Sequence, residues 1–203
     1  MSVARPSIRD TRSRRVTVVD PPTRTSTADR SSPAQGWRGS LGCWCLGGHR
    51  SDASYAIEVV IDSSGEWWRG TEAADLDVYL ADFRAGGYPV ARVVHATCTG
   101  CGGSTFRVLV DDEEGYTERR CTSCAARFLM LDSADMHDEA DPEQAACPCS
   151  NETFEVAVGS AVRDDSDVRW ASIALRCVSD GILGVYADWK IDYSPAAHLY
   201  DQV

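Results

Sequence analysis

The chain has 203 residues, with a hydrophobic fraction of 43% and an aromatic fraction of 8%, which suits one or two globular domains and excludes a wholly disordered protein. Its charge is unevenly spread. Residues 1–50 carry nine Arg and three Asp, whereas residues 51–203 carry 11 basic and 28 acidic side chains, a net charge of −17. An acidic body argues against a nucleic-acid partner, because sequence-independent affinity comes from Lys and Arg that displace counterions. Such a surface suits a basic protein partner, or simply keeps the protein in solution.

The sequence shows no segment that crosses or enters a membrane. No stretch reaches the roughly 20 apolar residues that span a bilayer, and no apolar core follows the N-terminal arginines as in a secretion signal. Four of the nine Cys form two pairs at the spacing of metal ligands. Because free thiols persist in reducing compartments, we expect a cytoplasmic protein with no membrane contact.

The first segment, residues 1–53, is rich in Arg, Ser, Thr and Pro and has no apolar period. Such a segment cannot bury enough surface to offset the entropy of ordering, so we expect a disordered tail. Within it, Cys43, Cys45 and His49 could bind a metal, but no second pair lies nearby. We interpret them as incidental.

Residues 54–97 predict a small β-α-β unit. Alternating apolar residues indicate a strand from Tyr55 to Asp62, and a second strand runs from Val90 to Thr97. A helix is expected over 73–85, with Thr71 as its N-cap and Gly86-Gly87 at its end. Its apolar stripe, at positions i, i+3, i+4 and i+7, consists of Leu76, Tyr79, Leu80 and Phe83.

The strongest signal is a pair of CxxC motifs in residues 98–131. Cys98 and Cys101 are separated by 19 residues from Cys121 and Cys124, a spacing typical of a four-thiolate zinc site. Two residues between thiolates let a tight turn present both sulfurs to one ion. Residues 106–110 and 116–120 read as the strands of a hairpin between the pairs.

At these residues the sequence resembles the zinc ribbon superfamily, over about 30 residues. The resemblance implies a rigid structural zinc site at Cys98, Cys101, Cys121 and Cys124, and no specific activity. A thioredoxin-like redox centre is the weaker alternative, because such motifs stand singly at a strand–helix junction. A closed shell of four sulfurs leaves no position for water, so we expect a non-catalytic zinc. His95 could support the metal from outside this shell, or be an ordinary packed histidine.

Residues 147–203, after an acidic linker at 132–146, echo the first ribbon. The segment from Cys101 to Val110 aligns with the segment from Cys149 to Val158, and Cys121 aligns with Cys177. Cys98 aligns with Cys147 if one residue is deleted, and Asp180 replaces the last cysteine. We interpret this internal repeat as a second, degenerate ribbon.

The second copy could bind metal through Cys147, Cys149, Cys177 and Asp180, since three thiolates and a carboxylate are an acceptable zinc set. The alternative is a ribbon that has lost its ion and relies on aromatic packing, for example through Trp189. We favour the alternative, because ligand geometry must be closely met.

The expected fold class is therefore α+β: a β-α-β unit followed by two antiparallel zinc-ribbon-like modules. The expected function is that of a non-catalytic structural zinc-binding protein that acts through protein–protein contacts, with no catalytic residue assigned. One alternative is an acidic inhibitor or immunity-type partner of a basic protein. Another is a nucleic-acid-associated ribbon that uses the basic tail. For the partner contact, one ring of Trp67-Trp68 is the best single candidate, because neighbouring strand residues face opposite sides.

Overall fold

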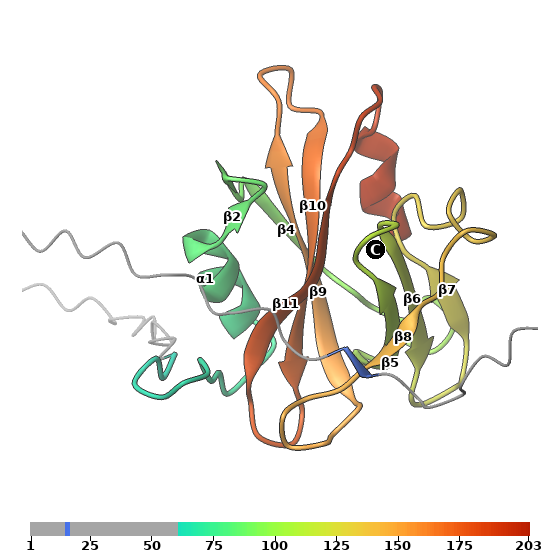
Figure 1. Ribbon diagram of the computed structural model, residues 1–203. Helices are drawn as coiled ribbons and strands as arrows, with labels where there is room; N and C mark the ends of the chain where they lie inside the picture. The colour runs from blue at the N-terminus through green and yellow to red at the C-terminus, as the bar shows by residue number, and fades with distance from the viewer. Residues whose placement is uncertain (1–14, 17–60) are drawn as a thin grey trace, which may run out of the picture. The chain divides into compact units, whose positions relative to one another are not determined.

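The computed structural model describes residues 15–16 and 61–203 (Figure 1). These residues form a nine-stranded sheet, a separate two-stranded hairpin and two short helices. The elements are β1 (Arg15–Val16), α1 (Asp75–Asp82), β2 (Arg84–Ala85), β3 (Tyr88–Pro89), β4 (Arg92–His95), β5 (Thr105–Asp111), β6 (Tyr116–Cys121), β7 (Arg127–Leu129), β8 (Glu143–Ala145), β9 (Phe154–Val162), β10 (Val168–Cys177), β11 (Leu183–Lys190) and the 3₁₀ helix η1 (Ala197–Gln202).

The large sheet has the order β1-β8-β5-β9-β10-β11, with β4 also paired to β9 and with β6 and β7 continuing from β5. Apart from the parallel pair β1–β8, its neighbouring strands are antiparallel. Ten-residue β10 and nine-residue β9 form its longest ladder.

The predicted architecture of a β-α-β unit followed by two small ribbon modules is wrong. Strand β4, expected to complete the unit, pairs with β9 through Arg92↔Ser160 to His95↔Ala157. Strand β9, expected in the second ribbon, also pairs with β5 of the first. The physical reason is that a lone two-stranded hairpin is marginally stable in water, whereas hairpins joined edge to edge share one core and cover each other's unpaired edges.

The two hairpins β5–β6 and β9–β10 have matching registers. Phe106 lies opposite Cys121 in the first hairpin, and Phe154 lies opposite Cys177 in the second. Phe106 and Phe154 are themselves Cα partners in the antiparallel pair β5–β9. Where the hairpins join, equivalent residues thus lie opposite each other, and the two hairpins are related by an approximate local two-fold axis.

The core lies on both faces of the sheet. Alternate residues of β9 and β10, such as Val156 and Leu175, pack with β5 and β6, while Ala157 and Ala174 pack on the other face against α1. From α1, Leu76, Tyr79 and Leu80 are fully buried, as the apolar stripe predicts. Strands β9 and β10 are apolar on both sides because both sides are covered.

The helix is shorter than predicted and begins at Asp75, so Thr71 is not its N-cap. The buried Asp75 carboxylate instead closes the preceding turn by accepting hydrogen bonds from the amides of Thr71 and Glu72. Gly86 and Gly87, with φ of 56° and 88°, form the turn between β2 and β3 rather than the helix end. Their positive φ angles suit a tight hairpin turn, which glycine adopts without strain.

Most of the predicted tail and most of the strand predicted from Tyr55 lie outside the described residues, including Cys43, Cys45 and His49. The segment expected as an acidic linker contains β8, which pairs with β5. Trp67 and Trp68 do face opposite sides, but each is half-buried, Trp67 against the core of β5 and β9 and Trp68 against that of α1. Each ring therefore contributes to packing within the described residues, and a contact with a partner stays a prediction.

Candidate metal centres

The first centre brings together all four cysteines of the two CxxC motifs. Their sulfur atoms lie within 4.8 Å of one another. The Sγ atoms of Cys98 and Cys124 are 3.5 Å apart, and those of Cys101 and Cys121 are 3.6 Å apart. In a tetrahedron with metal–sulfur bonds of about 2.3 Å the edges measure about 3.8 Å, so these separations fit one ion at the centre.

Two turns of the same kind shape this centre, one before β5 and one after β6. In the first, the Cys98 amide donates to the carbonyl of Gly103 and the Gly102 amide donates to that of Cys98. In the second turn, the Cys121 amide donates to the carbonyl of Ala126, and the Ala125 amide donates to that of Cys121. Gly102 and Ala125 have φ of 74° and 63°, which turns the chain back under the sulfurs.

Amide groups point at the sulfur of Cys121. The amide of Cys124 donates the hydrogen bond that most lowers the pKa of the Cys121 thiol, to about 6. At Cys101 the amide of Gly103 acts in the same direction, but hydrogen bonds with the neighbouring thiols outweigh it and raise the pKa to about 12. Four thiols this close cannot all ionise unless a cation neutralises them, which is what a bound metal supplies.

A buried arginine lies beside the first centre. Arg119 is 2% exposed, and its guanidinium group is stacked between the rings of Phe106 and Phe128, 4.7 Å and 4.6 Å from their centroids. It forms no ion pair with a carboxylate of residues 61–203. Burial lowers the pKa of Arg119, while Cys98 and Cys121 act to raise it, so these thiolates are its anionic neighbours. A divalent ion with four thiolates carries a net charge of −2, which a buried guanidinium partly balances.

The second centre is formed by the residues expected from the repeat. Ligand atoms of Cys147, Cys149, Cys177 and Asp180 also lie within 4.8 Å of one another. The Sγ atoms of Cys149 and Cys177 are 3.6 Å apart, and Cys147 Sγ is 3.4 Å from Asp180 Oδ1. Three thiolates and one carboxylate oxygen therefore converge, and this set also suits a tetrahedral ion.

The backbone turns of the second centre reproduce those of the first, with one shortened. The Cys177 amide donates to the carbonyl of Ile182, and the Gly181 amide donates to that of Cys177, as in the first centre. In the turn that lacks one residue, the Cys147 amide donates to Asn151 and the Ser150 amide donates to Cys147. Ser150 takes the positive φ, 70°, that Gly181 has at 75°. The deletion inferred from the alignment is absorbed within this turn, and the sulfur of Cys147 still reaches the cluster.

Asp180 is held in place by groups that sequence reasoning missed. The Arg69 guanidinium lies 3.7 Å from Asp180 Oδ2 and donates a 2.8 Å hydrogen bond to its carbonyl. Burial acts to raise the pKa of Asp180, but hydrogen bonds from Cys177 and from the Ile182 amide outweigh burial and hold it below the usual value. Burial is the main cause that raises the pKa of Cys147 and of Cys177. Arg69 carried no sequence signal, because it lies 111 residues away in the chain and reaches Asp180 through an isolated β-bridge with Ile182.

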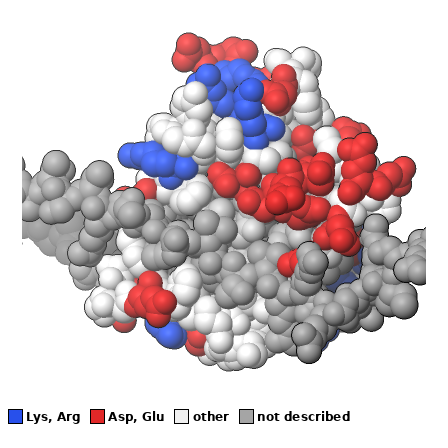
Figure 2. All heavy atoms as spheres, in the orientation of Figure 1, with Lys and Arg blue, Asp and Glu red and all other residues white. Residues whose placement is uncertain are grey.

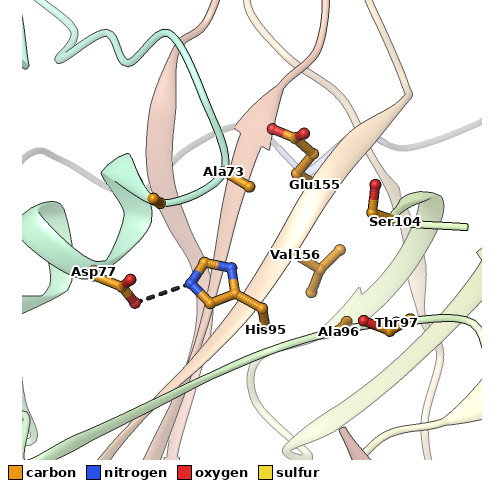
Figure 3. Close-up of a pocket in the computed structure, with 9 residues that line it drawn as sticks. Ala73, Asp77, His95, Ala96, Thr97, Ser104, Glu155 and Val156 are labelled. Carbon is orange, nitrogen blue, oxygen red and sulfur yellow. Dashed lines mark hydrogen bonds and ion pairs between the residues drawn. The ribbon is translucent and has the colours of Figure 1, made fainter. Parts of the chain in front are cut away.

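A pocket of about 310 Å³ lies beside the first centre, lined partly by Ala96 and Thr97, which precede Cys98. Figure 3 shows Asp77 and His95 at one end and Ser104 at the other. His95 Nε2 is 2.9 Å from Asp77 Oδ1, which ties β4 to α1 and gives this histidine a role away from the sulfurs. Among the described residues no hydrogen bond joins His95 to Ser104.

No other group of three or more His, Cys, Asp or Glu ligand atoms converges among the described residues, so the acidic side chains of 132–146 do not form a third centre. In the same part of the chain no helix is long and apolar enough to span a membrane. No family model, curated protein or solved structure matches the chain significantly.

Proposed function

We propose that the chain binds two zinc ions that hold its hairpins together, and that it acts through protein–protein contacts without catalysis. The observation that carries this proposal is the convergence of two complete four-ligand sets within 4.8 Å, each at the end of a hairpin. Tetrahedral sites rich in thiolate select zinc or iron, and the carboxylate in the second set favours zinc. Both sets are closed by protein atoms, so a bound ion keeps no position for substrate.

Metal content of the purified protein tests the proposal. We expect two zinc ions per chain by elemental analysis, falling to one in Cys121→Ser and to one in Cys177→Ser, with different centres emptied. Ser123→Ala, between two ligands of the first centre, is the matched control and should keep both ions. A content of one zinc that Cys177→Ser leaves unchanged would reduce the proposal to the first centre, and iron or no metal would overturn it.

A basic protein is the kind of partner that the surface favours. Asp141 donates its amide to the Asp111 carboxylate, and the Tyr116 ring packs on His137, so the β5–β6 turn lies beside the segment after β7. Their exposed acidic side chains form one acidic patch, which consists of Asp112, Glu113, Glu114, Asp135, Asp138 and Glu139. On the face shown in Figure 2, acidic side chains cover a broad area and basic ones lie in smaller groups.

Capture of a cationic model peptide, such as oligo-arginine, tests this partner class at low and high salt. We expect binding that weakens as salt screens the patch, and that is lost in a Glu113→Gln/Glu114→Gln/Asp138→Asn/Glu139→Gln variant. The matched control neutralises four exposed carboxylates elsewhere, at Glu66, Asp82, Asp164 and Asp165. Equal binding at both salt concentrations would contradict the proposal, as would equal loss in the control.

A further inference from the structure

Three arginines occupy directly paired positions on the outer face of the first hairpin. Arg107 of β5 is the Cα partner of Arg120 of β6, and Arg120 is the partner of Arg127 of β7. All three are exposed, whereas Phe106 and Val108 on the other face of β5 are buried. Residues directly opposite have Cβ atoms about 5 Å apart, and like charges in such pairs destabilise a sheet. Repulsion within this arginine row therefore lowers the stability of the sheet, and the exposed side chains gain no packing that offsets it.

Among residues 61–203, only one member of the arginine row has a counter-ion. Arg127 binds the Glu118 carboxylate through two hydrogen bonds of 2.7 Å. Arg107 and Arg120 make no ion pair and no side-chain hydrogen bond with another residue of 61–203. In an acidic chain of net charge −11, two neighbouring arginines without a carboxylate stand out.

The second hairpin shows what is missing from the first. By the matching registers, Glu155 occupies the position of Arg107, and Arg176 that of Arg120. There the two side chains form an ion pair, with Arg176 Nη1 2.6 Å from Glu155 Oε2. In the first hairpin arginine replaces the glutamate, so Arg120 faces a second cation in place of a carboxylate.

We propose that Arg107 and Arg120 bind an oxyanion, a carboxylate or phosphate group, of a small ligand. The site is a hollow of about 240 Å³, lined by Arg107, Arg120 and Arg127 together with Leu109, Glu118 and Gln144. Planar guanidinium groups match the oxygens of these anions in pairs. Arg127 already neutralises Glu118, so that carboxylate does not block the anion. The acidic body disfavours long polyanions such as nucleic acid, and the hollow suits a small molecule.

Titration with inorganic phosphate or succinate at constant ionic strength, followed by NMR of the arginine side chains, tests the site and separates the two anion chemistries. We expect saturable shifts at Arg107 and Arg120, and at least about tenfold weaker binding in Arg107→Gln and in Arg120→Gln. Arg84→Gln, an equal change of charge on the exposed β2, is the control and should bind as the parent does. No saturable shift with either anion, or equal weakening by Arg84→Gln, would overturn the proposal.

Arg107→Glu gives a second, independent readout, because it recreates the Glu–Arg pair of the second hairpin. Without added anion this variant should unfold about 2–4 °C higher than the parent, and phosphate should no longer raise its unfolding temperature. A midpoint that does not rise would show that the arginines do not repel one another and would contradict the reasoning.

Discussion

Arg119→Leu tests whether the buried arginine balances the charge of a metal centre. The register makes Leu175, which is fully buried, the counterpart of Arg119 in the second hairpin, so leucine is the residue that the fold already accepts at this position. The substitution removes one positive charge beside a cluster of net charge −2, and two cation–π contacts. Loss of such supporting groups commonly weakens metal binding by about 10–100-fold, or roughly 1.4–2.8 kcal/mol.

The metal-free protein should respond in the opposite direction. At a pH below about 6, where Cys121 is also protonated in the metal-free protein, Arg119 is a buried cation without a counter-ion, and replacing it by an apolar residue is neutral or stabilising. Zinc competition with a chromophoric chelator gives the affinity, and denaturant unfolding with and without zinc gives the two stabilities. Affinity unchanged by Arg119→Leu, or equal destabilisation with and without zinc, would refute charge balance and leave only packing. Arg92→Leu, which removes an arginine stacked on Tyr200 away from both centres, is the control.

Three further predictions test turns and buried hydrogen bonds of the fold. Gly181→Ala should cost more stability than Gly102→Ala and should empty the second centre. Both glycines have φ near 75°, but only at Gly181 would a Cβ lie 2.2 Å from a backbone oxygen. Denaturant unfolding and zinc content measure these effects, and equal costs of the two substitutions would contradict the reasoning. Asp75→Ala should lower the free energy of unfolding by about 1–3 kcal/mol, because two amides before α1 lose their buried acceptor; an unchanged denaturation midpoint would count against that role. The hydrogen bond from Ser194 is the largest cause that lowers the pKa of Asp167. The ionised carboxylate therefore contributes fully to the stability of the fold above the unfolded pKa of about 3.9, and this contribution is lost as the pH falls toward the folded pKa. The stability difference between parent and Asp167→Asn should shrink over that acid range, and a difference independent of pH would exclude the carboxylate as its source.

The sequence was most informative where chemistry fixes spacing. Both ligand sets converge at the residues named from their motifs, and the hairpin between Cys101 and Cys121 exists with the expected strands. Three of the four residues of the predicted apolar stripe are buried on α1, because burial of one face imposes a helical period, whereas Phe83 lies just beyond the end of the helix. These signals are local, so a single chain reveals them.

What the sequence could not reveal is how hairpins associate. The pairing of β5 with β9 and of β4 with β9 joins segments about 50 to 70 residues apart, and no periodicity encodes which strand edges meet. The helix start was misplaced because the sequence does not show which hydrogen bonds a side chain makes. Asp75 reads as an exposed helical residue, but it is buried and its carboxylate accepts hydrogen bonds from the turn before α1. The segment 132–146 was expected as a linker because of its many acidic residues, and the three-residue strand β8 within it is too short to show a strand pattern.

The two arginines beside the centres show that hairpins of matching register and similar ligand geometry take their positive charge from different places. The first centre has four sulfurs, and its counter-charge comes from within, from Arg119 on β6. In the second, the equivalent position is Leu175, and Arg69 supplies the positive charge from outside the hairpin by pairing with Asp180. A carboxylate ligand has a second oxygen free for such an ion pair, which a thiolate lacks. The aspartate at the fourth ligand position and the arginine that pairs with it therefore act together, and Asp180→Cys would leave Arg69 with no carboxylate there to pair with.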